Sequence, residues 1–289
     1  MLLQQLVNGL TIGSIYAIVA LGYSMVYGVL QIVNWAHADV LMVGTFIGLL
    51  LITEFHMPVL VMILLAALAT AIIGMAVERT AYRTIKVNRR MAVLVSALGV
   101  SVFLQNFAQL VFGSSTKPLV TIAKVPYTLG SVSFTNIQII IGVLTILMLA
   151  VLYYVVYKTK FGVAMRACSV SISNAKLMGI NTNFIISMTF GLGAFMAGIA
   201  GICIGTYYNA VYPTMGYMLG MKAFSAAILG GIGSIPGAVA GGFLIGIIES
   251  LGSGYISSGY RDAYAFIVMI VILFLRPSGI MGVKHIDKV

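Results

Sequence analysis

The sequence predicts an all-α fold, a polytopic bundle of about eight transmembrane helices. Hydrophobic residues make up 61% of the 289, charged residues only 8%, and the mean hydropathy is +1.10. Soluble globular domains carry about 25% charged residues, because water must wet their surface. So few charges cannot cover a water-facing surface of this size, and the chain is therefore predicted to be built for hydrocarbon.

Apolar runs of membrane-spanning length follow one another along the chain. A helix needs about 20 apolar residues to cross a bilayer core of about 30 Å. The runs that meet this criterion are 6–30, 58–77, 91–112, 136–157 and 183–206. Three further runs are irregular: 40–53 is short and follows a polar break at 31–39, 222–250 is split by glycines, and 263–275 lies between charged residues. Counting these runs gives seven to nine crossings, and eight is the single value expected.

The basic residues gather in three of the connectors between these runs. They are Arg79, Arg83, Lys86, Arg89 and Arg90; Lys158, Lys160, Arg166 and Lys176; and Arg276, Lys284 and Lys288. Cytoplasmic loops of membrane proteins are enriched in Lys and Arg, so these connectors and the C-terminus are predicted to be cytoplasmic. The connector 113–135 is predicted to face outward, and the side of the N-terminus stays open. Topology thus explains the net charge of +10, and nucleic acid is not expected as a partner.

The chain is expected to form a single transmembrane domain over residues 1–289. Its longest cytoplasmic connector, about 158–182, suffices for a short helix but is far too short for an ATPase fold. The start, MLLQQLVNG, lacks the basic region of a cleavable signal peptide, so the first span is expected to serve as the insertion signal.

Glycine residues mark helix contacts and one helix break. Pairs spaced four apart, as in Gly9 and Gly13 or Gly242 and Gly246, let helix backbones approach closely in lipid. A denser group precedes Gly242 and consists of Gly230, Gly231, Gly233 and Gly237. This group is predicted to break a helix, and irregular backbone at membrane depth is tolerated only inside protein or beside a watery cavity. It is therefore a candidate for lining a solute path or a gate.

Charged groups inside apolar runs are costly, so they are functional candidates. Glu249 lies near the end of the run that starts at Gly237, on the face that carries Gly242 and Gly246. It could face a solute path, or it could be a carboxylate near the membrane interface paired with a neighbouring cation.

Other polar candidates lie in the first half of the chain. Asn34, His37 and Asp39 are ordinary loop residues if 31–39 is a cytoplasmic turn, but they could bind a solute if it is a break within the bundle. Gln105 and Asn106, adjacent amides in the run 91–112, need partners in the bundle, and interhelical hydrogen bonds are favoured over solute contact.

Signatures of enzymes and metal sites are missing from the sequence. It contains neither an HExxH zinc motif nor a GxSxG nucleophile elbow, and Cys168 and Cys203 make no metal-ligand spacing. No lysine follows a glycine, so a GxxxxGK[ST] phosphate-binding loop cannot occur. Any ATP that drives transport must be hydrolysed by another polypeptide.

Several segments, in order along nearly the whole chain, resemble the permease subunits of bacterial ABC importers for branched-chain amino acids (LivH type). They are NGLTIGSIYA at 8–17, ALGYSMVYG at 20–28, NWAHA at 34–38, ERTAYR at 78–83, SVFLQN at 101–106, RAC at 166–168, GIN at 179–181, GGIGSIPGA at 230–238 and RPSG at 276–279. The segment at 34–38 has Ala38 where the family usually has glycine.

The resemblance implies a transport mechanism and a set of partners. These partners are a second related permease subunit, two cytoplasmic ABC ATPase subunits that use ATP and Mg, and an extracytoplasmic amino-acid-binding protein. The resemblance also implies that the chain lies in the inner membrane of a bacterial cell, in contact with membrane lipid. The segment from Ala175 to Gly179 resembles the short coupling helix that docks into an ATPase, and Arg166 lies in the same loop. The chain itself is expected to hold no cofactor and no metal. Alternatives are an ABC permease for another small solute, such as a simple sugar, and an ATP-independent channel or secondary transporter.

Overall fold

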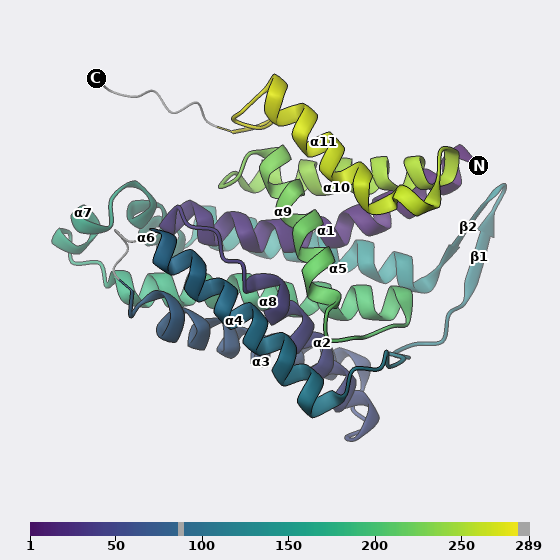
Figure 1. Cartoon of the computed structure of the whole chain (residues 1–289), viewed down its shortest axis with the longest axis horizontal. Coiled ribbons are helices and arrows are strands. Elements are labelled where there is room, and N and C mark those ends of the chain that lie inside the picture. The colour runs from purple at the N-terminus through teal and green to yellow at the C-terminus, as the bar shows by residue number, and fades with distance from the viewer. Residues whose placement is uncertain (86–89, 283–289) are drawn as a thin grey trace.

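A computed structural model gives the fold and describes residues 1–85 and 90–282. The elements of these residues are shown in Figure 1. The helices are α1 (Leu2–Leu30), α2 (His37–Thr53), α3 (Val59–Val77), α4 (Arg90–Phe112), α5 (Asn136–Lys158), α6 (Lys160–Val170), α7 (Ile172–Leu177), α8 (Thr182–Tyr208), α9 (Met215–Gly230), α10 (Ile235–Tyr255) and α11 (Arg261–Leu275). A π-helical turn (Glu78–Tyr82) extends α3, a 3₁₀ turn (Ser258–Tyr260) precedes α11, and β1 (Pro126–Leu129) pairs with β2 (Val132–Thr135).

The prediction of an all-α, polytopic membrane fold is confirmed. Among the described residues, seven helical segments are long and apolar enough to cross a bilayer: α1, α3 with its π-helical turn, α4, α5, α8, α10, and α11 with its 3₁₀ turn. Two shorter helices lie among them, α2 with 17 residues and α9 with 16. The expected number of about eight crossings lies between seven, the count without α2 and α9, and nine, the count that includes them among the described residues.

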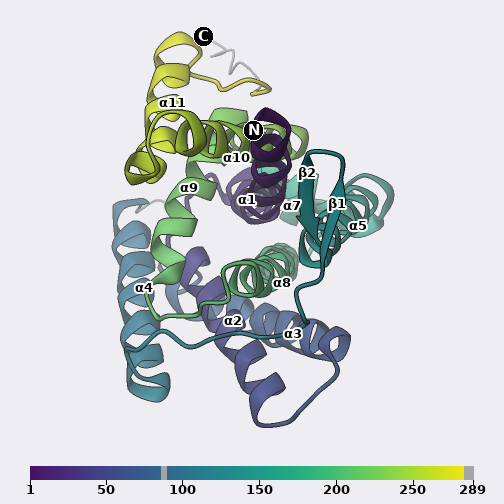
Figure 2. The same cartoon turned by 90° about the vertical axis from the view of Figure 1, so that its right-hand side faces the viewer.

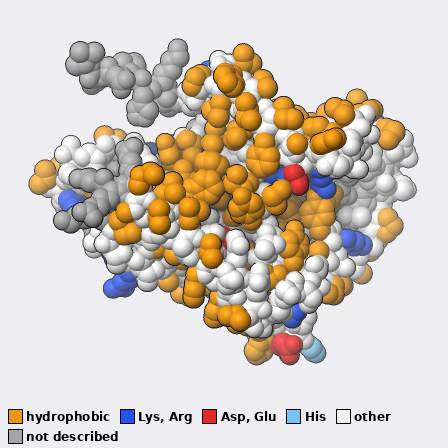
Figure 3. All heavy atoms as spheres, in the orientation of Figure 1, with side chains coloured by type: hydrophobic (Ala, Val, Ile, Leu, Met, Phe, Trp, Pro, Cys, Tyr) orange, Lys and Arg blue, Asp and Glu red, His pale blue; other side chains and the backbone are white. Residues whose placement is uncertain are grey.

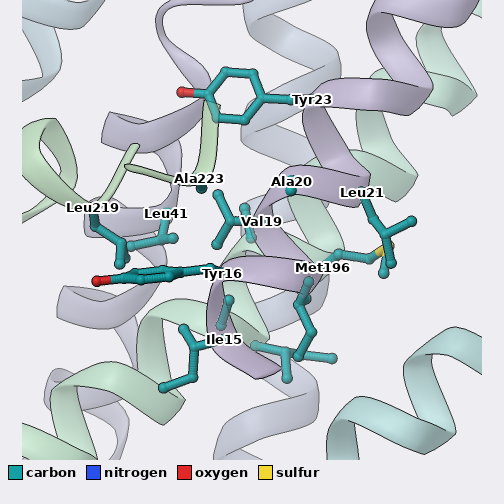
Figure 4. Close-up of a cluster of buried hydrophobic side chains, with 14 of the residues drawn as sticks. Ile15, Tyr16, Val19, Ala20, Leu21, Tyr23, Leu41, Met196, Leu219 and Ala223 are labelled. Atoms are coloured by element: carbon teal, nitrogen blue, oxygen red, sulfur yellow. The ribbon is translucent and has the colours of Figure 1, made fainter. Parts of the chain in front are cut away.

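Helix α1 forms the centre of the bundle. It is buried without interruption from Thr11 to Val26, as expected of a helix surrounded by protein. Figure 2 shows α1 nearly end-on, with α8, α9, α10 and α5 around it. Figure 4 shows side chains of α1, from Ile15 to Tyr23, meeting Leu41, Met196 and Leu219 from three other helices.

Small residues bring α1 and α10 into close contact, as the glycine spacing predicts. A Cβ atom on Gly242 would lie 2.5 Å from the Cα atom of Ala17, and one on Gly13 would lie 2.9 Å from the Cα atom of Phe243. Lipid tails are as apolar as Leu, so helices in a membrane associate through such close packing and not through the hydrophobic effect. Glycine is therefore the residue that this helix contact requires.

The basic connectors lie at one end of the bundle. Arg83, which follows α3, donates hydrogen bonds to the Asn183 carbonyl oxygen (3.3 Å) and to Ser187 Oγ (2.5 Å) at the start of α8. The connector after α11 bonds to the end of α9, where Met281 N donates to the Gly230 carbonyl oxygen (2.9 Å). Figure 1 shows α6 and α7 at this end, with the N-terminus and the β-hairpin at the other. Lys86, Arg89, Lys284 and Lys288 lie outside the described residues.

The connector 113–135 contains a β-hairpin that the sequence analysis did not predict. Its strands alternate in side-chain direction over only four residues each and turn at Gly130, which has φ +62°. Gln4 on α1 holds the hairpin: its side-chain nitrogen donates to the Ser133 carbonyl oxygen (2.7 Å), and Ser133 N donates to its side-chain oxygen (2.8 Å). This contact joins the first turn of α1, which precedes the apolar run, to the hairpin.

Candidate functional site

The polar break after α1 lies within the bundle and is not a loop in water. Asn34, His37 and Asp39 are all buried, and only residues 31–36 leave the helical conformation. Asn34 Oδ1 accepts a hydrogen bond from the Tyr82 hydroxyl (2.7 Å), so the break is fixed against the end of α3. Of the two interpretations left open by the sequence, the structure thus favours the break. Whether these side chains touch a solute stays a prediction.

Asp39 connects α2 to α4 through two hydrogen bonds. Its carboxylate accepts from Ser101 Oγ (2.5 Å) and from Gln105 Nε2 (2.9 Å). The interhelical role expected of Gln105 is therefore confirmed. Asn106 differs, because it is exposed and its one side-chain hydrogen bond within residues 1–85 and 90–282 goes to the Val102 carbonyl oxygen of its own helix (2.7 Å). The expectation of a bundle partner for Asn106 is wrong, since consecutive side chains on a helix point in different directions and only one can face α2.

His37 sits in a tight aromatic contact between α1 and α2. Its ring lies edge-on to Tyr23, with 4.7 Å between ring centroids, and Nε2 has no hydrogen-bond partner in the described part of the chain. A Cβ atom at Gly22 would clash with this ring. Glycine at position 22 is therefore required by the close approach of this ring to α1.

Glu249 is the centre of a buried ion-pair cluster that joins four helices. Its Oε1 accepts from Lys222 Nζ of α9 (3.0 Å) and Arg261 Nε of α11 (2.5 Å), and its Oε2 accepts from the Tyr16 hydroxyl of α1 (2.8 Å). Lys222 Nζ also lies 2.5 Å from Asp262 Oδ1. We call Lys222, Glu249, Arg261 and Asp262 the charge cluster. Its two cations and two anions balance, as charges at membrane depth must.

From the sequence, Glu249 could face a solute path or pair with a neighbouring cation, and the structure shows the cation pairing with partners that the sequence did not identify. The sequence offers one signal: Lys222 is a cation at the start of an apolar run, and the same cost argument applies to it as to Glu249. What the sequence does not show is that residues 27 positions apart are brought together, because that depends on how α9 and α10 pack.

The predicted helix break at the glycine group is confirmed as a tight turn between α9 and α10. Helix α9 ends at Gly230 and α10 begins at Ile235, with Ser234 Oγ accepting a hydrogen bond from Gly237 N (3.2 Å). Gly231 and Gly233 have φ values of +103° and +91°, which side chains with a Cβ rarely adopt. The turn lies at the end of the bundle with the basic connectors, and its role as a path or a gate stays a prediction.

The connector 158–182 forms two short helices, α6 and α7. Arg166 donates to the Val156 carbonyl oxygen and stacks its guanidinium over the Tyr157 ring, so it anchors α6 to α5. Ala175 is buried in α7, and Gly179 ends the loop with φ +79°.

Ala175 is therefore not on the surface of this loop, whereas Arg166 is exposed but contacts α5. The most exposed apolar side chains there are Val170, Leu177 and Met178, each more than 80% accessible. The sequence window at 175–179 contains two of them, but only burial shows which positions point outward.

The described residues contain no group of three or more His, Cys, Asp or Glu side chains that could hold a metal ion. The groups assembled inside the bundle include amides, hydroxyls, the His37 ring, the Asp39 carboxylate and the charge cluster. Such groups can orient a solute or connect helices.

Comparisons with known proteins show what the chain is similar to. Residues 5–275 match the family described as branched-chain amino acid transport system / permease component. The chain is 40% identical to the high-affinity branched-chain amino acid transport system permease protein LivH of Escherichia coli K12, covering 99% of this chain and 97% of that one. It is 41% identical to the corresponding permease BraD of Pseudomonas aeruginosa, covering 99% and 98%.

A solved structure supports the fold at lower sequence similarity. PsaBC from Streptococcus pneumoniae in complex with Fab superposes with a TM-score of 0.51 at 14% identity, covering 94% of this chain and 91% of that one. This likeness concerns the fold alone. The family match and the full-length relatives together show that the chain belongs to the permease component family of branched-chain amino acid transport systems.

Proposed function

We propose that the chain is the membrane-spanning permease subunit of an ATP-driven importer that translocates branched-chain amino acids. The observation that carries this proposal is the match over nearly the full length to high-affinity branched-chain amino acid permeases. The structure agrees with this proposal, because its helices are long and apolar enough to cross a bilayer and they bury ionisable side chains, which in membrane segments typically mark functional sites.

The orientation of the chain follows from its charges. The basic connectors gather at one end of the bundle, and positive charge favours the cytoplasm. The C-terminus is then cytoplasmic, whereas the N-terminus and the β-hairpin face the outside. In this arrangement the protein spans the inner membrane of a bacterial cell.

ATP hydrolysis belongs to separate subunits. The sequence contains no phosphate-binding loop, so two cytoplasmic ABC ATPases supply the ATP- and Mg-dependent step. A second related permease completes the pathway, and an extracytoplasmic binding protein delivers the amino acid. The chain itself catalyses no reaction and moves its solute by alternating access.

The loop that receives the motion of the ATPases is the connector 158–182. Leu177 and Met178 expose apolar surface at the end of the bundle that would lie in cytoplasmic water. Apolar groups exposed together in this way typically mark a protein contact. Arg166 holds the loop rigidly to α5, so a push on α7 would reach the long helices instead of being absorbed locally.

Uptake into proteoliposomes tests the proposed function. The chain is reconstituted with its partner permease and ATPases, with binding protein and labelled L-leucine on the outer side of the chain and ATP at the ATPases. Leucine should accumulate with ATP and fail to accumulate with ADP or when the ATPases are omitted. Binding-protein-stimulated leucine uptake without the ATPases would contradict the ATP-driven mechanism and favour a channel or secondary transporter.

A further inference from the structure

A cleft of about 460 Å³ lies beside the charge cluster, within the range of roughly 300–1,000 Å³ typical of small-molecule sites. Lys222, Arg261 and Asp262 form its charged edge, whereas Glu249 lies behind them and is fully buried. The rest of the wall is apolar or aromatic and includes Ile204, Met218 and Leu219. The cleft thus joins a charged edge to an aliphatic wall.

The charged edge presents both signs to the cleft. The Arg261 side chain is 32% accessible and that of Asp262 is 52% accessible, so a guanidinium and a carboxylate on adjacent residues can be reached from the cleft. Lys222 and Glu249 have almost no accessible surface and act as their internal counter-ions. A ligand with both an anionic and a cationic group therefore matches this edge.

Charge balance selects among possible ligands. The charge cluster is neutral as a whole, and an unbalanced charge at membrane depth is expensive. A zwitterion brings no net charge and can exchange ion pairs with Arg261 and Asp262. A simple carboxylate or a simple amine would instead add one unbalanced charge to a cluster that is neutral without it.

The position of the cleft suits entry from outside. Tyr208 and Tyr212, near the connector from α8 to α9, line the cleft together with the start of α11. This is the end of the bundle opposite the basic connectors (Figure 1). Figure 3 shows that much of the surface in this view is hydrophobic, with charged side chains at only a few places. A place where charged side chains adjoin an apolar wall, as in this cleft, is therefore uncommon on this face.

We propose that this cleft is a binding site for the zwitterionic amino acid as it enters the bundle. The α-carboxylate binds the Arg261 guanidinium, the α-ammonium binds the Asp262 carboxylate, and the aliphatic side chain packs on Ile204, Met218 and Leu219. The inference rests on the proposed import function and adds the residues that receive the substrate within this chain.

Protection of an introduced thiol tests the site in the purified complex of permeases and ATPases without binding protein. Met218→Cys places a thiol in the cleft wall, and both native cysteines are buried. L-Leucine should slow the reaction of this thiol with a maleimide. 4-Methylpentanoate, which lacks the ammonium group, and 3-methylbutylamine, which lacks the carboxylate, should not do so at the same concentration. A thiol at Leu129 on the hairpin serves as the position control.

Two further substitutions connect protection to the charged edge. Asp262→Asn and Arg261→Gln, each combined with Met218→Cys, should raise the leucine concentration needed for protection by about tenfold or more, the loss expected for one charge-assisted hydrogen bond. Glu54→Gln removes an exposed carboxylate elsewhere and should change nothing. Arg261 contacts buried Glu249 and its replacement can disturb folding, so the more exposed Asp262 gives the decisive variant.

The outcomes separate this inference from the proposed function. If leucine protects no better than the two single-charge analogues, or if Asp262→Asn behaves like Glu54→Gln, while ATP-driven uptake proceeds, the cleft site is overturned and the import function stands. If ATP-driven uptake itself fails, both are overturned. Selective protection by leucine that is lost in Asp262→Asn supports the site.

Discussion

Replacing Glu249 with glutamine removes the charge at the centre of the charge cluster while nearly preserving shape. The carboxylate is fully buried and accepts hydrogen bonds from Lys222, Arg261 and Tyr16. Glutamine keeps one acceptor oxygen but places an NH₂ donor where a second acceptor stood. The variant therefore leaves two cations facing one remaining carboxylate, that of Asp262.

The magnitude follows from burial and from the partners that remain. Removing one member of a buried ion pair costs about 3–5 kcal/mol, because the other charge is left without compensation. Lys222 retains Asp262 at 2.5 Å, and the Arg261 side chain is 32% accessible to its surroundings. We therefore expect a loss near the lower limit, about 3 kcal/mol. The entropy of unfolding is about 2.1 cal/mol/K per residue, or roughly 0.6 kcal/mol/K for 289 residues, so a loss of about 3 kcal/mol should lower Tm by roughly 5 °C.

Thermal unfolding of the purified chain in detergent, followed by far-ultraviolet circular dichroism, measures this loss. Glu54→Gln is the matched control, since it removes an exposed carboxylate and should leave Tm unchanged. Lys222→Met combined with Glu249→Gln should destabilise less than the sum of the two single variants, because each removes the other's unpaired charge. A Glu249→Gln chain that melts with the Glu54→Gln control would refute the reasoning, and so would additive effects in the double variant.

Three further predictions concern packing, coupling and orientation. Gly242→Ala should destabilise the chain by about 1–3 kcal/mol in the same melting assay, because the added methyl group overpacks the contact with α1. The control Gly99→Ala, with open space around its Cβ, should leave stability unchanged or raise it. Equal effects of the two substitutions would contradict the close α1–α10 contact. Leu177→Asp should abolish copurification with the ATPases while Leu129→Asp, an equally apolar change at the other end, preserves it; retained copurification in Leu177→Asp would exclude this docking surface. In intact cells a membrane-impermeant maleimide should label Leu129→Cys and spare Leu177→Cys. Background labelling of Cys168 should be low, because burial raises the pKa of its thiol. The reverse labelling pattern would show that the chain has the opposite orientation.

Local features of the sequence predicted most of the helices. Apolar runs gave the spans to within a few residues, because a membrane helix satisfies its own backbone hydrogen bonds and needs only a continuous apolar surface. The turn between α9 and α10 was predicted because Gly231 and Gly233 permit backbone angles that other residues avoid. The hairpin was missed because strands of four residues carry a weak periodic signal.

The candidate site was only partly predictable. The cost of burying a charge singled out Glu249 and Asp39 without any structure. It could not show that Asn106 points away from the bundle or that Ala175 is buried in its loop, since both depend on the rotation of a helix relative to its neighbours.

The sequence by itself determined that this protein spans a membrane many times, where its helices break and which connectors are basic. These properties depend on the composition of continuous segments, so reading along the chain is enough to find them. Only the tertiary structure decided that Lys222, Arg261 and Tyr16 meet at Glu249, that the polar break after α1 is buried, and that a cleft adjoins the charge cluster. Such contacts join residues far apart in the chain, and they arise from how closely helices can pack, which no single segment specifies.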